Sequence, residues 1–249
     1  MSASGEVAVS ARTGFAGATV RNEILARLSA ADWALVAPRL EPVALKERQV
    51  IETPGRRITH AYFLDSGLAS VVAANAEGHR IEVGVVGKES MTGFPLVMGD
   101  DHSQASVYMQ IAGHGHRVDA AALTDAMQAS PSLSALVLKS AHAFMIQTTH
   151  TALANGRARL DARLARWLLM ARDRLDNDTV PLTHEFLAAM LGVRRAGVTV
   201  ALNGFAQRGL VAMRRGQITL VDRAGIEQVA GSFYGAPEAE LKRLMAEAA

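Results

Sequence analysis

The segment from Pro181 to Asp222 limits the possible folds of this chain more than any other part of its sequence. Thr183 is a favourable N-cap for a helix that runs from Glu185 to Leu191, and Gly192 supplies the permissive backbone that ends a helix before a sharp turn. A second helix is expected to begin near Arg194. The segment therefore predicts two helices joined by a tight turn.

A β-hairpin is expected directly after the second helix. Residues 210–213 and 217–221 have the pattern of two short strands, and Arg214, Arg215 and Gly216 lie between them. Helix, turn, helix and hairpin in this order form the plan of a winged helix-turn-helix. A basic tip on such a hairpin is placed to contact a sugar-phosphate backbone, which adds affinity without sequence information.

The second helix has an inward and an outward face. Val198, Leu202 and Phe205 recur at helical spacing, so they are expected to be buried on one stripe. The outward positions are Ala196, Thr199, Val200, Asn203 and Gln207.

Arg194 and Arg195 at the start of this helix have two interpretations. They do not favour helix stability, because positive charge at an N-terminus opposes the helix dipole. They are either two solvated surface arginines or contacts to phosphates and guanine edges, since the first residues of a recognition helix enter the major groove. The basic hairpin that follows favours the second interpretation.

The charges of the chain are unevenly distributed. The 249 residues have a formal net charge of only +2. Residues 157–215 nevertheless contain eleven arginines against five acidic side chains, whereas residues 21–156 contain eleven basic and thirteen acidic side chains. This asymmetry is typical of a nucleic-acid-binding module.

Composition excludes several classes of protein. The chain has no cysteine, which excludes disulfides, thiolate metal sites and iron–sulfur clusters. No apolar run reaches the length of a membrane span, and the first twenty residues lack the pattern of a signal peptide. We therefore expect a cytoplasmic protein with no membrane partner, and no cofactor is predicted.

The first half of the chain is predicted to contain a tail, two short helices and then a set of strands. Residues 1 to about 20 lack periodicity and predict a flexible tail, and two short helices are expected over 22–28 and 29–36. Short strand-like runs separated by turns then predict a small antiparallel barrel or jelly roll. These runs cover residues 43–45, 49–52, 59–64, 68–74, 80–85, 106–112 and 116–119.

A long helix is expected to start at Ser130 and Pro131, which supply a cap and a first-turn proline. Its seam consists of Leu133, Val137, Ala141, Phe144, Thr148 and Thr151. The seam either packs on the barrel or pairs with its symmetry mate in a dimer. Another helix is expected over residues 160–174, with a hinge before it at Asn155 and Gly156.

The order of these elements, and several local sequences, resemble the Crp/Fnr family of bacterial transcription regulators. The most specific segments are RLARWLLMARDRL and LTHEFLAAMLGVRRAGVTVALNGFAQRGLV. The resemblance implies an α+β fold with an antiparallel jelly-roll domain of the cyclic-nucleotide-binding type, a long dimerisation helix and a C-terminal winged helix-turn-helix domain. The implied divisions are residues 1–20 (tail), 21–130 (jelly roll), 131–158 (dimerisation helix and hinge), 159–235 (winged helix) and 236–249 (helical tail).

The resemblance also implies a function. A homodimer joined through the long helix would read a pseudo-palindromic site in double-stranded DNA, with RNA polymerase and a small-molecule effector as further partners. Arg195 matches the family arginine that contacts a guanine, whereas Ala196 and Val200 replace a commonly acidic residue and an arginine, so a different DNA sequence is expected. The expected DNA-contacting residues are Thr183, Arg194, Arg195, Ala196, Thr199, Val200, Asn203, Arg214 and Arg215.

The cyclic-nucleotide motif of the family is incomplete here. Residues 87–90 (Gly-Lys-Glu-Ser) partly resemble the ribose-binding half, but residues 104–106 (Gln-Ala-Ser) stand where the phosphate-binding arginine is expected. A buried phosphate without a cation is unfavourable, so we expect that cyclic AMP does not control this protein. The expected effector pocket contains Lys88, Glu89, Ser90, Gln104, Ser106 and Thr148.

An alternative hypothesis is a cupin-like metal-dependent enzyme, or a small-molecule-binding protein without sequence-specific DNA binding. His114 and His116 alternate on a predicted strand, so both imidazoles would point to one side, as metal ligands do. The nearby carboxylate, Asp119, falls on the other strand face, and the HExxH, GxSxG and P-loop patterns are absent. The sequence therefore favours a DNA-binding regulator that is not an enzyme and holds no metal.

Overall fold

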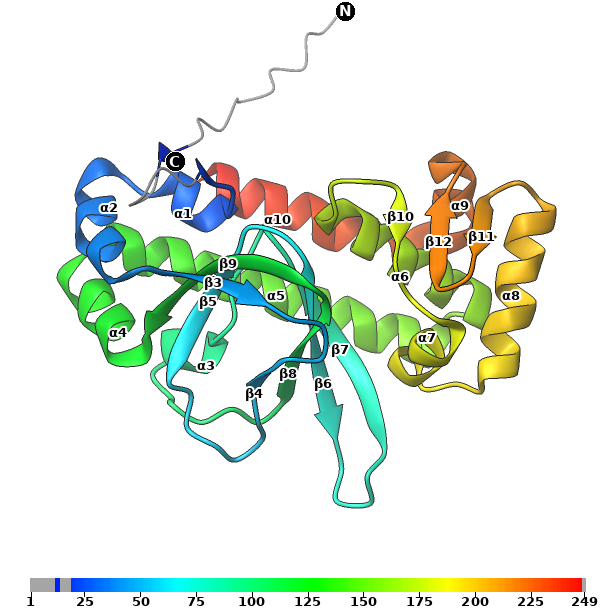
Figure 1. Cartoon of the computed structure of the whole chain (residues 1–249), viewed down its shortest axis with the longest axis horizontal. Coiled ribbons are helices and arrows are strands. Elements are labelled where there is room, and N and C mark those ends of the chain that lie inside the picture. Colours follow the sequence, from blue (N-terminus) through cyan, green and yellow to red (C-terminus); the bar gives the residue numbers. More distant parts are fainter. Residues whose placement is uncertain (1–11, 14–18, 248–249) are drawn as a thin grey trace, which may run out of the picture.

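The computed structural model describes residues 12–13 and 19–247 (Figure 1). Short strands β1 (Arg12–Thr13) and β2 (Thr19–Val20) pair antiparallel, and most of the predicted flexible tail lies outside the described residues. Helices α1 (Glu23–Arg27) and α2 (Ala30–Val36) follow, with a 3₁₀ turn η2 (Ala37–Arg39).

The barrel consists of two antiparallel sheets with the strand orders β3-β9-β5 and β4-β8-β6-β7. Apolar side chains of both sheets, such as Phe63 and Val107, belong to one buried core. All seven strands predicted from the sequence are confirmed, with ends that differ by at most three residues. Their bounds are β3 Glu41–Leu45, β4 Val50–Glu52, β5 His60–Leu64, β6 Leu68–Ala74, β7 Arg80–Val86, β8 Ser106–Ile111 and β9 Gly113–Asp119.

Three helices cover the barrel. The short α3 (Phe94–Val97) and the unpredicted α4 (Ala120–Ala129) precede α5 (Pro131–Arg157), which Ser130 caps as expected. Helix α5 runs close against β7, as the contact between Gly84 and Phe144 shows. A Cβ added at Gly84 would lie only 2.6 Å from the Phe144 ring. Glycine at this position therefore permits the close approach of helix and strand.

The break between the two helices lies after the residues predicted as a hinge. Asn155 and Gly156 are inside α5, and Asn155 accepts a hydrogen bond from Arg163 Nε at 3.1 Å. The helical backbone is interrupted at Ala158 and Arg159, which are both extended, before α6 (Leu160–Arg174) begins. Asparagine and glycine are poor helix formers, but the hydrogen bonds of the long helix outweigh that preference here.

The C-terminal domain has the predicted winged helix-turn-helix plan. Its helices pack around a second core that contains Leu168, Leu187 and Phe205. A small sheet of order β10-β12-β11 completes it. The elements after α6 are β10 Thr179–Val180, α7 His184–Leu191, α8 Arg195–Gln207, β11 Val211–Arg214, β12 Gln217–Leu220 and α9 Arg223–Ala230.

The chain then returns to the first domain. After the 3₁₀ turn η3 (Gly231–Phe233), helix α10 (Ala236–Ala246) packs along α5 (Figure 1), and its Leu244 and Met245 join the core of the barrel domain. Lys139 Nζ on α5 donates to the carbonyl oxygen of Glu247 at 2.8 Å. The C-terminal helix thus ties the winged-helix domain to the barrel domain. None of the described helices is both long enough and apolar enough to cross a membrane.

Candidate nucleic-acid interface

Helix α8 lies at one end of the molecule, and α7 lies between it and the barrel (Figure 1). The Thr183 hydroxyl accepts a hydrogen bond from the backbone N–H of Phe186 at 3.2 Å, as its predicted capping role requires. Gly192 has a φ of 62°, and its N–H donates to the carbonyl oxygens of Ala188 and Ala189. These local signals fix the direction in which α8 leaves the turn.

The two faces of α8 are as predicted. Val198, Leu202 and Phe205 are buried, and α8 packs on α6, α7 and β11 through this side. The exposed side chains of the helix and its cap are Arg194, Arg195, Ala196, Val200, Asn203 and Gln207.

Thr199 is less available for contact with DNA than predicted. Its hydroxyl lies 3.0 Å from His184 Nδ1, and the side chain is half-buried between α8 and α7. Burial and the nearby positive charge of Arg195 lower the pKa of His184, which favours the neutral imidazole. Thr199 therefore helps to fix α8 on α7.

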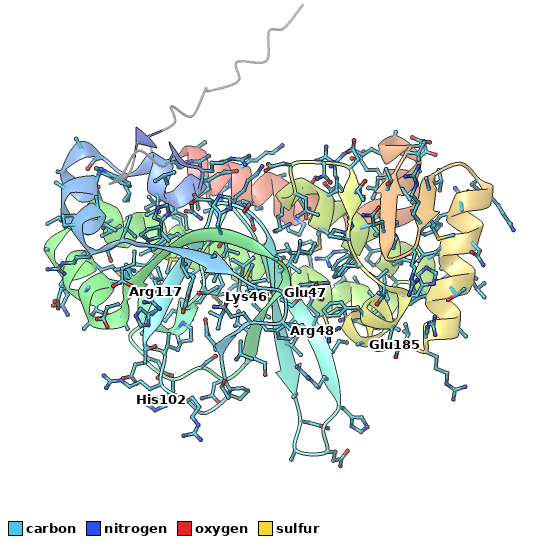
Figure 2. The ribbon with its side chains drawn as sticks, in the orientation of Figure 1. Lys46, Glu47, Arg48, His102, Arg117 and Glu185 are labelled. Atoms are coloured by element: carbon cyan, nitrogen blue, oxygen red, sulfur yellow. The ribbon has the colours of Figure 1, made fainter. Side chains whose placement is uncertain are left out.

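The start of α8 and the tip of the hairpin carry four exposed arginines. Arg214 pairs with Gln217 across β11 and β12, and Arg215 occupies the turn. Among the described residues, no carboxylate oxygen lies within 4 Å of the side-chain nitrogens of Arg194, Arg214 or Arg215. Arg195 Nε is 3.8 Å from a carboxylate oxygen of Glu185 on α7, a loose and exposed pair. Figure 2 labels Glu185.

Some other arginines of this domain are paired with carboxylates. Arg223 bonds the Asp173 carboxylate at 2.8 Å and Glu227 at 2.8 Å, and Arg172 pairs with Asp178. Among the described residues, the unpaired positive charge of this domain includes the start of α8 and the hairpin tip. Guanidinium groups that are not paired within the protein can bind phosphate oxygens or guanine edges.

A cavity of about 630 Å³ lies between the barrel and α5. Its walls are mainly apolar and include Phe94 and Phe144, whose rings stack at 4.3 Å. The buried Glu52 contributes a carboxyl group whose pKa is raised by desolvation, and His102 lies on an outer loop of the barrel (Figure 2). Among the described residues, none of those that line the cavity is lysine or arginine.

The residues expected in one effector pocket do not lie together: only some of them line the cavity beside α5. Gln104 and Thr148 line the cavity, and the half-buried Ser106 begins β8. Ser90 instead bonds Ser140 at 2.9 Å.

Lys88 and Glu89 face the C-terminal domain. Lys88 Nζ contacts Asp176 at 3.1 Å. Arg174 Nε on α6 donates to Glu89 Oε1 at 2.7 Å, and both side chains are buried. These two residues therefore take part in domain docking.

The predicted seam of α5 faces the barrel of its own chain. Leu133, Val137, Ala141 and Thr151 are buried there, and Phe144 and Thr148 are half-buried. A different stripe is exposed and contains Leu138, Met145 and Leu153. The exposed positions 138, 142, 145, 149 and 152 alternate in spacing between four and three, and Leu153 lies next to the last of them. This spacing is the sequence signal that could have indicated the exposed stripe.

The two alternating histidines have separate protein partners. His114 Nδ1 lies 2.7 Å from Ser66 Oγ, whereas the buried His116 lies 3.1 Å from Asp65. Within the described residues, the one group of three or more potential metal ligands consists of the largely exposed Asp100, Asp101 and His102. Arg57 Nε already pairs with Asp101 at 2.6 Å. The arrangement thus gives no preorganised metal site at residues 114–119.

Comparison with known proteins agrees with this geometry. The family model of the Crp-like helix-turn-helix domain matches residues 162–229, which contain α7, α8 and the hairpin. No curated protein matches the sequence significantly.

Three solved structures illustrate the similarity of the fold. FixK2 from Bradyrhizobium japonicum has a TM-score of 0.68 at 15% identity and covers 78% of this chain and 98% of its own. The c-di-GMP-responsive global regulator CLP from Xanthomonas campestris has a TM-score of 0.63 at 16% identity, with 77% and 99% covered. A Crp/Fnr-family transcriptional regulator from Thermus thermophilus has a TM-score of 0.60 at 20% identity, with 78% and 100% covered.

Proposed function

We propose that this protein, which contains a Crp-like helix-turn-helix domain and has the fold of the Crp/Fnr transcription regulators, is a homodimeric regulator that binds a specific DNA site. The main support is the unpaired positive charge of three exposed arginines: Arg194 at the start of α8, and Arg214 and Arg215 at the hairpin tip. In this proposal Arg195 reads a guanine from the start of α8, and the hairpin tip binds the phosphate backbone.

The exposed stripe of α5 supports dimerisation. Leu138, Met145 and Leu153 are 45%, 57% and 49% exposed, which is unfavourable for large apolar side chains on one helix unless a partner covers them. Pairing of this stripe with the same stripe of a second copy forms a two-fold interface. Two recognition helices related by that axis then read a pseudo-palindromic site.

Control by a cyclic nucleotide is not part of the proposal. The cavity beside α5 has apolar walls and offers the acidic Glu52 and Asp100, but no lysine or arginine among its described lining residues. A cyclic phosphate there would lack a cationic partner. A neutral ligand fits this lining better than an anion.

An enzymatic role is not proposed. His114 and His116 are engaged with Ser66 and Asp65, so they do not converge on one ligand position. The geometry instead supports DNA binding, and we propose that the protein acts in the cytoplasm.

Selection from genomic DNA tests the proposal. Purified full-length protein is incubated with fragmented genomic DNA at near-physiological salt, and bound fragments are sequenced. An Arg194→Ala/Arg195→Ala variant is compared with Arg56→Ala/Arg57→Ala, which removes an equally exposed arginine pair from the barrel. Enrichment of a pseudo-palindrome by the wild type and the control, but not by the first variant, is the expected result. Equal enrichment by all three proteins would overturn the proposed role of α8.

A further inference from the structure

The outward face of α8 has an apolar patch at its centre. Ala196 and Val200 are both exposed, and their spacing of four residues makes them neighbours on the helix surface. The Val200 side chain is 72% exposed, more than any other exposed large hydrophobic residue in the described chain, including Val50 at 64%. The patch is therefore uncovered at the place where the helix would meet DNA.

Several residues beside the patch have contacts within the protein. Val198 and Ala201 point into the domain core, and the Thr199 hydroxyl is held by His184. Arg195 lies one position before the patch, with its guanidinium near Glu185. The two apolar side chains thus stand alone between the arginines at the start of the helix and Asn203 further along it.

Alanine and valine limit what this surface can recognise. Their side chains have no hydrogen-bond donor or acceptor, so they cannot distinguish the polar edges of base pairs. The major groove exposes one apolar base group, the C5-methyl of thymine, and apolar side chains contact it. The other base edges offer Val200 no comparable apolar group to contact.

We propose that Ala196 and Val200 form an apolar reading patch that selects thymine in the DNA half-site through its C5-methyl group. This inference rests on the proposed function of α8 as a recognition helix. Arg195 would then read the guanine on one side of the patch, and thymine would be required at one or two facing positions.

The test removes single methyl groups from DNA. In the selected site, each dT is replaced in turn by dU, which lacks only the C5-methyl, and the dissociation constant is measured by fluorescence anisotropy. We expect binding to weaken about fourfold at one or two positions of each half-site, the size expected for one buried methyl, and to be unchanged elsewhere. A 5-methylcytosine placed at the same position should bind better than cytosine.

Protein variants identify the side chain that senses the methyl. Val200→Ala should reduce the dU penalty to less than about twofold, and Val50→Ala, an exposed valine on the barrel, should retain the full penalty. Circular dichroism checks that both variants fold. Two outcomes would overturn this inference but leave the proposed function intact. In the first, the enriched site binds equally well with dT and dU at every position. In the second, Val200→Ala shows the same loss of affinity on dU substitution as the wild type. A selection that enriches no sequence overturns the proposed function, and this inference with it.

Discussion

Trp167 on α6 donates its indole N–H to Glu82 on β7, with 2.5 Å between Trp167 Nε1 and Glu82 Oε1. This bond joins the C-terminal domain to the barrel at a fully buried carboxyl group. Ser70 Oγ lies 2.5 Å from Glu82 Oε2 and also contacts the side-chain oxygen of Gln110, although a hydroxyl has one proton to donate. Two arrangements satisfy both contacts: a protonated Glu82 that donates to Ser70, or a Gln110 amide turned so that its Nε2–H donates to Ser70.

The domain contact should therefore depend on pH. Desolvation raises the pKa of Glu82 to about 7, against the lowering effects of Ser70, Trp167 and nearby arginine charge. The folded state holds this proton at pH values where the unfolded state has lost it, so the contribution of Glu82 to the unfolding free energy falls as pH rises from about 4.5 to about 7. The total loss should be on the order of 3 kcal/mol.

Glu82→Gln should flatten that part of the pH profile, because glutamine keeps an acceptor for Trp167 and cannot ionise. Urea unfolding followed by circular dichroism at pH 5 and pH 7.5 measures the difference. Glu77→Gln, in the exposed β6–β7 turn, serves as the control and should keep the wild-type slope. A wild-type slope in Glu82→Gln would show that another group controls the transition.

The buried pair between Arg174 and Glu89 predicts a second stability effect. Arg174→Ala leaves the Glu89 carboxylate in a buried site without its cation, and the expected loss of unfolding free energy is about 3–5 kcal/mol. Arg243→Ala removes an arginine whose pairs with Glu240 and Glu247 are exposed, and should lower the unfolding free energy much less. Urea titrations of both variants at pH 7 compare them, and similar losses would contradict a structural role for the buried pair.

Much of the fold could be predicted because its signals are local. Thr183 caps α7 through an N–H three residues away, and Gly192 takes up the left-handed backbone that follows it. Strand patterns and the stripe of α8 likewise depend on residues that are close in sequence. Such signals are sufficient to predict the winged helix-turn-helix plan and the seven barrel strands.

The features that the sequence does not predict depend on contacts between residues that are far apart in the chain. Periodicity showed that α5 has apolar positions, but it did not show that Leu133 is covered by the barrel while Leu138 is not. The contact between Trp167 and Glu82 joins residues 85 positions apart, and the packing of Leu244 requires the chain to return to its first domain. No local pattern specifies these contacts.

Two arginines should have separable effects on DNA binding. Arg195→Ala is expected to reduce discrimination between the selected site and random DNA by about 1–3 kcal/mol, because a base contact is lost. Arg214→Ala should weaken binding to both DNAs similarly and reduce the salt slope by about 0.9, as for the loss of one phosphate contact. Anisotropy titrations at several salt concentrations measure both quantities. Identical profiles for the two variants would contradict the assigned roles.

The dimer is predicted to depend on the exposed stripe of α5. In a two-fold interface Met145 faces the same stripe of the second copy, so Met145→Glu would bring two carboxylates into an apolar contact. We expect the dimer dissociation constant to rise at least about tenfold, as measured by sedimentation velocity over a range of concentrations. Leu35→Glu places the same charge at another partly exposed apolar position, on α2, and should leave the dimer intact. If Met145→Glu dimerises with the same dissociation constant as the wild type, the interface lies elsewhere. Loss of dimer in both variants would indicate a general effect of added charge.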